Sequence, residues 1–230
     1  MRNRPLLRFL VVAVVALAAA LLLDRAAYTY LYDPGVYDKD WGRMLRTMGF
    51  LPFWLLGAVA LWLHDRAPTP AGGGDVAPRT SWRPSRRALL LLLGPTASGI
   101  VGALLQLVIR RERPWAAAGA YVFRPFSDRP LYGGGLAMPS SHAIVAFGAA
   151  FALARIFPRT AVVWYLLAVG CALTRVAARA HFLSDVTLAA LVAWAVVAWL
   201  WRRWGPGRPA RPGRPDRSVG PTAPLRRPAR

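Results

Sequence analysis

The sequence predicts an all-α polytopic membrane protein, built as a bundle of six transmembrane helices. Two observations support this prediction. Of the 230 residues, 56% are hydrophobic and only 17% are charged, whereas about 25% of the residues in an average soluble domain are charged. The hydrophobic residues also fall into six long runs, each close to the length of about 17 to 25 residues that a helix needs to cross a bilayer. The composition therefore excludes an ordinary soluble domain and a disordered chain.

The six predicted spans contain few charges, and the exceptions are informative. The first run resembles a signal peptide, but Asp24 and Arg25 follow it in place of a small-residue cleavage site, so we expect it to be retained. The fifth run contains Arg175 and Arg179 in its second half, which indicates a polar environment there. The predicted spans are residues 5–23, 47–64, 88–109, 138–154, 160–180 and 186–201.

The charges of the loops predict the orientation of the bundle. The loop 24–46 has no net charge, the loop 65–87 has a net charge of +3, and the tail from Arg202 has nine arginines against one aspartate. Because cytoplasmic loops carry an excess of Lys and Arg, we expect both termini and the loop 65–87 to face the cytoplasm in an inner (cytoplasmic) membrane. The loop 110–136 also sums to +3 but falls on the outer, periplasmic side. A basic cluster on that side indicates an anion-binding site.

The chain divides into one domain and a tail. Residues 1–204 form the predicted six-span domain, and residues 205–230 repeat Arg-Pro, which predicts a disordered cytoplasmic tail. The Pro- and Gly-rich stretch 68–78 is typical of a linker, and residues 33–46 are typical of an interfacial helix. The arginines lie between apolar runs, so we interpret them as topology signals and anion ligands and expect no nucleic-acid partner. The single cysteine, Cys171, excludes an internal disulfide, and the oligomeric state is not determined.

Three polar clusters lie at the predicted outer ends of the spans. The first ends the third span, where Gln106, Arg110 and Arg113 would share one face of a helix at 100° per residue. The second is the segment 139–142 (Pro-Ser-Ser-His), which begins the fourth span. Small hydroxyl residues at a helix start leave backbone N–H groups available to a phosphate.

The third cluster lies between the fifth and sixth spans. It contains Thr174, Arg175, His181 and Asp185. If the chain is helical here, Asp185 lies one turn beyond His181 and can accept its second ring N–H, which would hold one tautomer.

This set of histidines, arginines, hydroxyl residues and one aspartate suits phosphoryl transfer without a metal or other cofactor. One imidazole can attack phosphorus, a second can protonate the leaving oxygen, and arginines can hold the phosphoryl oxygens. A Ser-His-Asp hydrolase can also be assembled from Ser140, His142 and Asp185. That alternative leaves Arg113 and Arg175 without a role, so it fits less well.

The three clusters resemble the motifs of the type 2 phosphatidic acid phosphatase superfamily, a family of membrane lipid phosphatases. The family motifs are Lys-x6-Arg-Pro, Pro-Ser-Gly-His and Ser-Arg-x5-His-x3-Asp. In the same order, the chain has Gln-x6-Arg-Pro from Gln106, Pro-Ser-Ser-His from Pro139, and Thr-Arg-x5-His-x3-Asp from Thr174. Three motifs in register over residues 106–185 are far more specific than any one of them.

The resemblance implies a phosphatase that acts on lipid phosphates or diphosphates through a phosphohistidine, with membrane lipids around it. It implies that His181 is the nucleophile, Asp185 its orienter and His142 the general acid. The phosphate-binding residues that it implies are Arg113, Ser140, the backbone of Ser141, and Arg175. The sequence does not distinguish undecaprenyl diphosphate, phosphatidic acid, phosphatidylglycerophosphate and a lipid A phosphate as substrates.

The main departure from the family pattern is Gln106, which replaces a lysine and removes a charge expected at the phosphate. We expect Arg110, one turn along the same face, to supply that charge, unless two arginines suffice. The alternative hypothesis is a weakened family member that binds or transports lipid phosphates without hydrolysis. The other arginines near this side are interpreted as interfacial residues of smaller importance. They are Arg111, Arg124, Arg129 and Arg179.

Overall fold

The computed structural model describes residues 4–66 and 85–204, and all the regular elements in these ranges are helical. The all-α prediction is therefore confirmed for this part of the chain. The predicted linker 68–78 and the predicted tail 205–230 lie outside the described residues. The helices are α1 (Arg4–Tyr30), α2 (Asp40–Thr47), α3 (Leu51–His64), α4 (Arg86–Ile109), α5 (Ser141–Ile156), α6 (Ala161–Ala177) and α7 (Leu183–Trp204), with the 3₁₀ turns η1 (Pro114–Ala117) and η2 (Pro158–Thr160).

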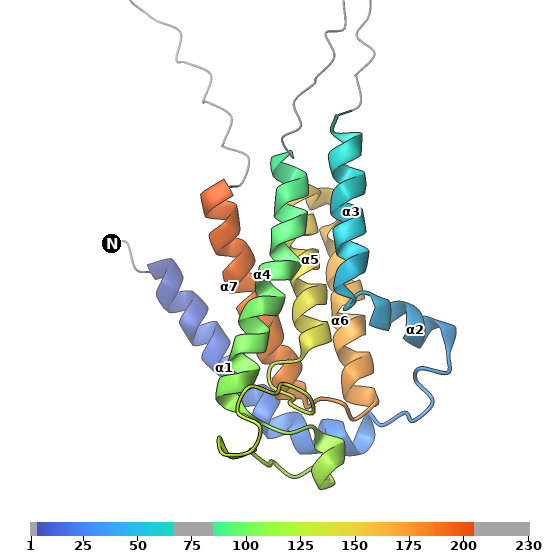
Figure 1. Ribbon diagram of the computed structural model, residues 1–230, viewed down its shortest axis with the longest axis vertical. Helices are drawn as coiled ribbons and strands as arrows, with labels where there is room; N and C mark the ends of the chain where they lie inside the picture. Colours follow the sequence, from blue (N-terminus) through green and yellow to red (C-terminus); the bar gives the residue numbers. More distant parts are fainter. Residues whose placement is uncertain (1–3, 67–84, 205–230) are drawn as a thin grey trace, which may run out of the picture.

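Helix α5 lies at the centre of the bundle and packs against α4, α6 and α7 (Figure 1). Its sequence is rich in Ala and Gly, which lets the neighbouring backbones approach closely. A Cβ added at Gly148 would lie 2.9 Å from the carbonyl oxygen of Gly94 on α4, so this crossing requires glycine. Helix α1 packs mainly on α7 and leaves large apolar side chains such as Leu7 and Val14 exposed, as expected for a lipid-facing helix.

The described helices account for four or five candidate membrane spans. Helices α1, α4, α6 (counted with η2) and α7 are each long and apolar enough, and α2 with α3 passes as one span bent by 65°. Helix α5 is apolar but has only 16 residues, or about 24 Å at 1.5 Å per residue. A helix thus lies in every predicted apolar run, while the count of six spans stays a prediction.

Residues in the left-handed conformation lie just beyond the ends of two helices. Helix α4 ends at Ile109, since Arg110 has φ of 57°. The stripe of Gln106, Arg110 and Arg113 on one helical face was therefore wrong. Helix α6 ends at Ala177 and α7 begins at Leu183, with Arg179 at φ of 51° in the turn between them. The condition that the chain is helical from His181 to Asp185 is therefore not met, because His181 precedes the start of α7.

The three predicted polar clusters meet at one end of the bundle. The end of α4, the start of α5, the end of α6 and the start of α7 all lie there, together with the last part of α1 and the loop between α4 and α5 (Figure 1). The end of α3, the start of α4 and the end of α7 lie at the opposite end. The antiparallel topology thus brings together residues that are distant in sequence.

Candidate active site

The start of α5 is anchored by Ser140, which is fully buried. Its hydroxyl accepts a hydrogen bond from the Ala143 N–H at 3.5 Å, and its own N–H donates to the Asp185 carbonyl at 3.2 Å. Ser140 is thus the N-cap of α5 and also joins the start of α5 to the start of α7. Ser141 follows as an exposed residue in the first helical turn, where the backbone N–H groups favour an anion.

His142 follows on the same turn and is half-buried against the bend between α2 and α3. A Cβ added at Gly49 would lie 2.6 Å from the His142 Cβ, so only glycine lets this bend approach so closely. The electrostatic neighbours of His142 are Arg175, Arg46 of α2, His181 and Arg113. The structure therefore places both predicted catalytic histidines in one charged environment.

His181 is buried in the turn between α6 and α7, with 2% of its surface exposed. Its Nδ1 lies 2.9 Å from the carbonyl oxygen of Ala137, so we assign the ring proton to Nδ1. Burial lowers the pKa of His181, and Arg175 and Arg113 lower it further, while Asp185 raises it. The ring is therefore neutral, with its lone pair on Nε2.

Asp185 lies in the first turn of α7 and fixes the turn that carries His181. One of its oxygens accepts the Phe182 N–H at 2.7 Å, which is the reciprocal half of a capping box, and the other pairs with Arg111. The nearest contact between the carboxylate and His181 Nδ1 is 3.7 Å. The ring N–H therefore donates to Ala137, and the influence of Asp185 on the ring is electrostatic.

Arg113 and Arg175 are the two arginines that the family resemblance predicted as phosphate ligands. Arg175 is buried, and its guanidinium donates to the Tyr37 hydroxyl at 2.8 Å. Burial lowers the pKa of Arg113, and repulsion from Arg175 lowers it further, whereas Asp185 raises it. Two partly desolvated cations that repel each other favour an anion between them.

Unpaired buried nitrogen atoms gather at this end of the bundle. The residues that the structure describes have seven buried side-chain N or O atoms without a hydrogen-bond partner, and four of them belong here. They are His181 Nε2 and the Nε atoms of Arg111, Arg113 and Arg175. Because buried polar atoms are nearly always paired, such a group indicates a site for a ligand rich in acceptor oxygens.

Two predicted phosphate ligands have other partners. The Gln106 side chain donates to the Pro139 carbonyl at 2.8 Å and thereby positions the segment 139–142. The Arg110 guanidinium is buried and bonded to backbone carbonyls of the loop that follows α4, so the expectation that it replaces the missing lysine is not supported. The carbonyls belong to Arg124, Pro125, Asp128, Arg129 and Pro130.

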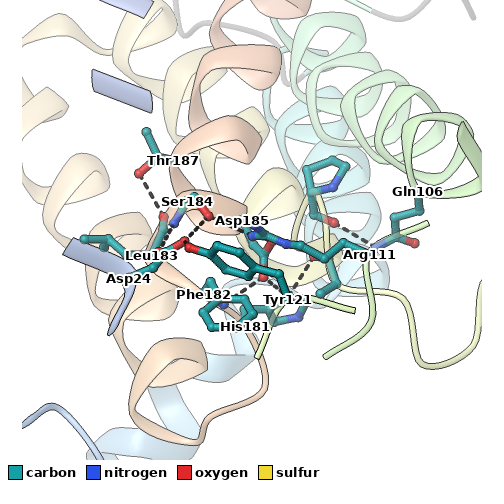
Figure 2. A network of polar contacts seen from close by, with 12 residues as sticks. Asp24, Gln106, Arg111, Tyr121, His181, Phe182, Leu183, Ser184, Asp185 and Thr187 are labelled. Carbon is teal, nitrogen blue, oxygen red and sulfur yellow. Dashed lines mark hydrogen bonds and ion pairs between the residues drawn. The ribbon is translucent and has the colours of Figure 1, made fainter. Parts of the chain in front are cut away.

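Sequence reasoning missed a buried polar network behind the site, which Figure 2 shows. Arg111, interpreted as an interfacial residue, is 2% exposed and pairs with Asp185. Asp24 of α1 is 1% exposed and bonds to Ser184, and Tyr121 donates to the same carboxylate. The one sequence signal for this network was Asp24 itself, which directly follows the first apolar run. An ionisable group at membrane depth usually has a functional role.

These features define a helical membrane protein with a buried, cationic, two-histidine site at one end of its bundle. The sequence profile of the PAP2 superfamily matches residues 87–207, which is more than half of the chain, so the chain belongs to that superfamily. The matched region holds all three polar clusters. Asp24 lies outside it.

Two curated relatives are lipid A 1-phosphatases, one from Rhizobium etli and one from Rhizobium johnstonii. Each is 39% identical to the chain over 93 residues, which is 39% of this chain and 38% or 36% of the relative. The match thus spans well under half the length of these relatives. No solved structure gives a significant match to the chain.

Proposed function

We propose that the protein is a metal-independent phosphatase that releases phosphate from a lipid phosphate or diphosphate through a phosphohistidine at His181. The observation that carries this proposal is the unpaired Nε2 of the neutral, buried His181 beside the unpaired Nε atoms of Arg113 and Arg175. Membership of the PAP2 superfamily supports a lipid phosphatase.

In the first step, His181 Nε2 attacks phosphorus while the bond from phosphorus to the lipid oxygen breaks. His142, which takes up a proton when the anionic phosphate is bound beside it, gives that proton to the leaving oxygen. Arg113, Arg175 and the first-turn N–H groups of α5 stabilise the negative charge on the three phosphoryl oxygens, the task that a metal ion performs in other phosphatases. The Ala137 carbonyl and the Asp185 carboxylate stabilise the imidazolium that forms, because both lie next to Nδ1.

In the second step, a water molecule attacks phosphorus and the bond between phosphorus and Nε2 breaks. His142, now neutral, takes the proton from that water, and His181 leaves as a neutral imidazole. Inorganic phosphate then departs, and both histidines have their starting protonation states. Of the predicted site residues, only Ser140, Gln106 and Arg110 have no direct role in these two steps.

For the substrate, we propose a lipid whose phosphate reaches the site from the outer leaflet of an inner membrane, with both chain termini in the cytoplasm and six spans. The names of the Rhizobium relatives support lipid A carrying a 1-phosphate as the first candidate. Undecaprenyl diphosphate, phosphatidic acid and phosphatidylglycerophosphate are the other three.

The test is phosphate release by the purified protein against these four lipids, with EDTA present and His181→Ala as the control. We expect turnover of at least one lipid by the parent protein and none by His181→Ala. An acid-labile phosphoprotein, trapped by rapid quenching, identifies the intermediate. Lipid binding without any phosphate release would favour the second candidate, a protein that binds or transports lipid phosphates. The neutral Gln106, which stands where the family has a lysine, is the observation that favours this candidate.

A further inference from the structure

We propose that Asp24 on α1 is a positioning residue for this site: it acts through the Ser184 hydroxyl to hold Arg111, and with it Asp185 and His181, in place. The proposal rests on the proposed function, because the site that it supports is the one described above. Asp24 does not touch the reacting atoms. It also lies outside the residues that the superfamily profile matches.

The Asp24 carboxylate is 1% exposed, and both of its oxygens accept hydrogen bonds. One oxygen accepts the Ser184 N–H at 2.8 Å, and the other accepts both the Ser184 hydroxyl and the Tyr121 hydroxyl, the latter at 2.8 Å (Figure 2). Burial, together with the bond to Asp24, raises the pKa of Tyr121 to about 12, so this phenol stays a donor. A buried carboxylate is tolerated only when its oxygens are bonded in this way.

The Ser184 hydroxyl transmits the orientation of Asp24 to Arg111. A serine hydroxyl has one proton, and here it is donated to Asp24. The Ser184 oxygen therefore receives its other hydrogen bond as an acceptor, from Arg111 Nη2 at 2.7 Å. The same Nη2 pairs with Asp185, so the direction of the hydroxyl bond determines where the guanidinium rests.

Arg111 connects this network to the proposed nucleophile by two routes. Its guanidinium pairs with Asp185, whose carboxylate fixes the backbone N–H of Phe182 next to His181. Its backbone carbonyl accepts the Ala137 N–H at 2.7 Å, and the Ala137 carbonyl in turn accepts the His181 Nδ1 proton. The guanidinium also packs against the rings of Tyr121 and Phe182, at 5.1 Å and 4.9 Å from their centroids.

A merely structural role would have Asp24 fasten α1 to α7 without affecting the chemistry. The two roles differ in how Asp24 and Ser184 combine. If Asp24 acts through the Ser184 hydroxyl, Asp24→Asn should have no further effect on kcat in the Ser184→Ala background. Ser184→Ala keeps the backbone N–H that bonds to Asp24 but removes the hydroxyl that links Asp24 to Arg111. If Asp24 only fastens α1, the two substitutions add.

The experiment measures kcat, KM and vanadate affinity for Asp24→Asn, Ser184→Ala and the double variant. Vanadate is the probe because it resembles the phosphoryl transition state. The matched control is Asp40→Asn, since Asp40 is an exposed acid on α2 that pairs with Arg43 at the surface. Melting temperatures show that each variant is folded at the assay temperature, and Ser184→Ala keeps the test open if Asp24→Asn does not fold.

We expect Asp24→Asn to lower kcat by about tenfold to a hundredfold with little change in KM, since a small displacement of the reacting group has an effect of this size. Vanadate affinity should fall with kcat, and Asp40→Asn should match the parent. The double variant should be no slower than Ser184→Ala alone.

The other outcomes distinguish a failure of the positioning role from a failure of the proposed function. Additive losses of kcat, or an Asp24→Asn variant with parental kcat and vanadate affinity, would overturn the positioning role. Parent protein that releases no phosphate but binds vanadate in an Asp24-dependent way would overturn the proposed function and support the positioning role. Parent protein that neither turns over nor binds vanadate would overturn both.

Discussion

At each end of the bundle a serine, an aspartate and an arginine are in contact, but the two clusters differ in how far they are buried. At the end opposite the site, the Ser85 hydroxyl donates to Asp65 at 2.5 Å and Arg87 pairs with Asp65 at 3.1 Å. That arginine is 38% exposed, whereas the side chains of Arg111 and Asp185 at the site are 2% and 0% exposed.

The difference shows what burial adds to a polar contact. A partly exposed pair such as Arg87 and Asp65 is screened by water and contributes about 0 to 1 kcal/mol, so the Asp65 cluster serves mainly to cap α4, where Ser85 accepts the Ala88 N–H. A buried pair contributes position more than stability, since its members cannot leave their partners without a large desolvation cost. The buried end can therefore hold a reacting group in place, and the exposed end cannot.

The largest effect is expected at the histidines, which also differ between the two ends. His181→Ala should lower kcat by about 1,000-fold or more, because it removes the atom that bonds to phosphorus. His64 ends α3 at the opposite end, so His64→Ala is the matched control and should leave kcat unchanged. The measurement is steady-state phosphate release from the lipid that the parent protein hydrolyses fastest.

His142→Ala separates the roles of the two site histidines. It should lower kcat by about 10² to 10⁴ for lipid substrates, whose leaving oxygen needs a proton. For a nitrophenyl phosphate, whose leaving group needs no proton, the loss should be much smaller. Equal losses on both substrates would contradict the assignment of His142 as the general acid.

The second prediction compares the two arginines directly. Arg111→Ala should lower the free energy of unfolding by about 3 to 5 kcal/mol, because it leaves Asp185 buried without its cation. Arg87→Ala should lower it by about 0 to 1 kcal/mol, because Arg87 is 38% exposed and Asp65 keeps the Ser85 hydroxyl as a partner. Denaturation of the purified protein in mild detergent measures both values, and similar losses would break the comparison between the ends.

The third prediction concerns pH and the buried imidazole. The folded state lowers the pKa of His181, so protons bind the unfolded chain more tightly than the folded one at this position. The contribution of a neutral His181 is therefore fully present above the unfolded pKa of about 6.5 and is lost as pH falls below it, toward the lower folded pKa. The melting temperature of the parent should fall more steeply between pH 7 and pH 5 than that of His181→Gln. Parallel curves would show that His181 does not titrate in this way.

The sequence predicted the all-helical fold and the clustering of the three motifs at one end of the bundle. It did not predict the helix ends or the side-chain contacts as well. The apolar runs each contain a helix, since hydrophobicity is a local property, and Arg113, Ser140, His142, Arg175 and Asp185 reach one end of the bundle because the run lengths determine where each helix ends. The left-handed Arg110 and Arg179 were missed because glycine, the usual sign of such a helix end, is absent there. The contact between Asp24 and Ser184 spans 160 positions, so no local pattern contains it.

The smallest effect on catalysis is expected at Arg110, which adjoins Arg111 in sequence but differs from it in role. The Arg110 guanidinium is bonded to five carbonyls of the loop after α4, so Arg110→Ala should cost about 1 to 3 kcal/mol of stability by removing the hydrogen bonds that hold this loop. Vanadate affinity, measured on folded protein, should stay within about threefold of the parent, which is under 1 kcal/mol.

Gln106→Lys provides the sharpest check on this last prediction. If Arg110 held the phosphate, Gln106→Lys would restore the affinity that Arg110→Ala loses. In the observed geometry it cannot, because Gln106 and Arg110 serve different carbonyls: Gln106 holds Pro139 at the start of α5, and Arg110 holds the loop. Gln106→Lys should therefore not recover the stability that Arg110→Ala loses. A rescue of vanadate binding by Gln106→Lys in the Arg110→Ala background would show that Arg110 reaches the anion and that its carbonyl contacts are released when substrate binds.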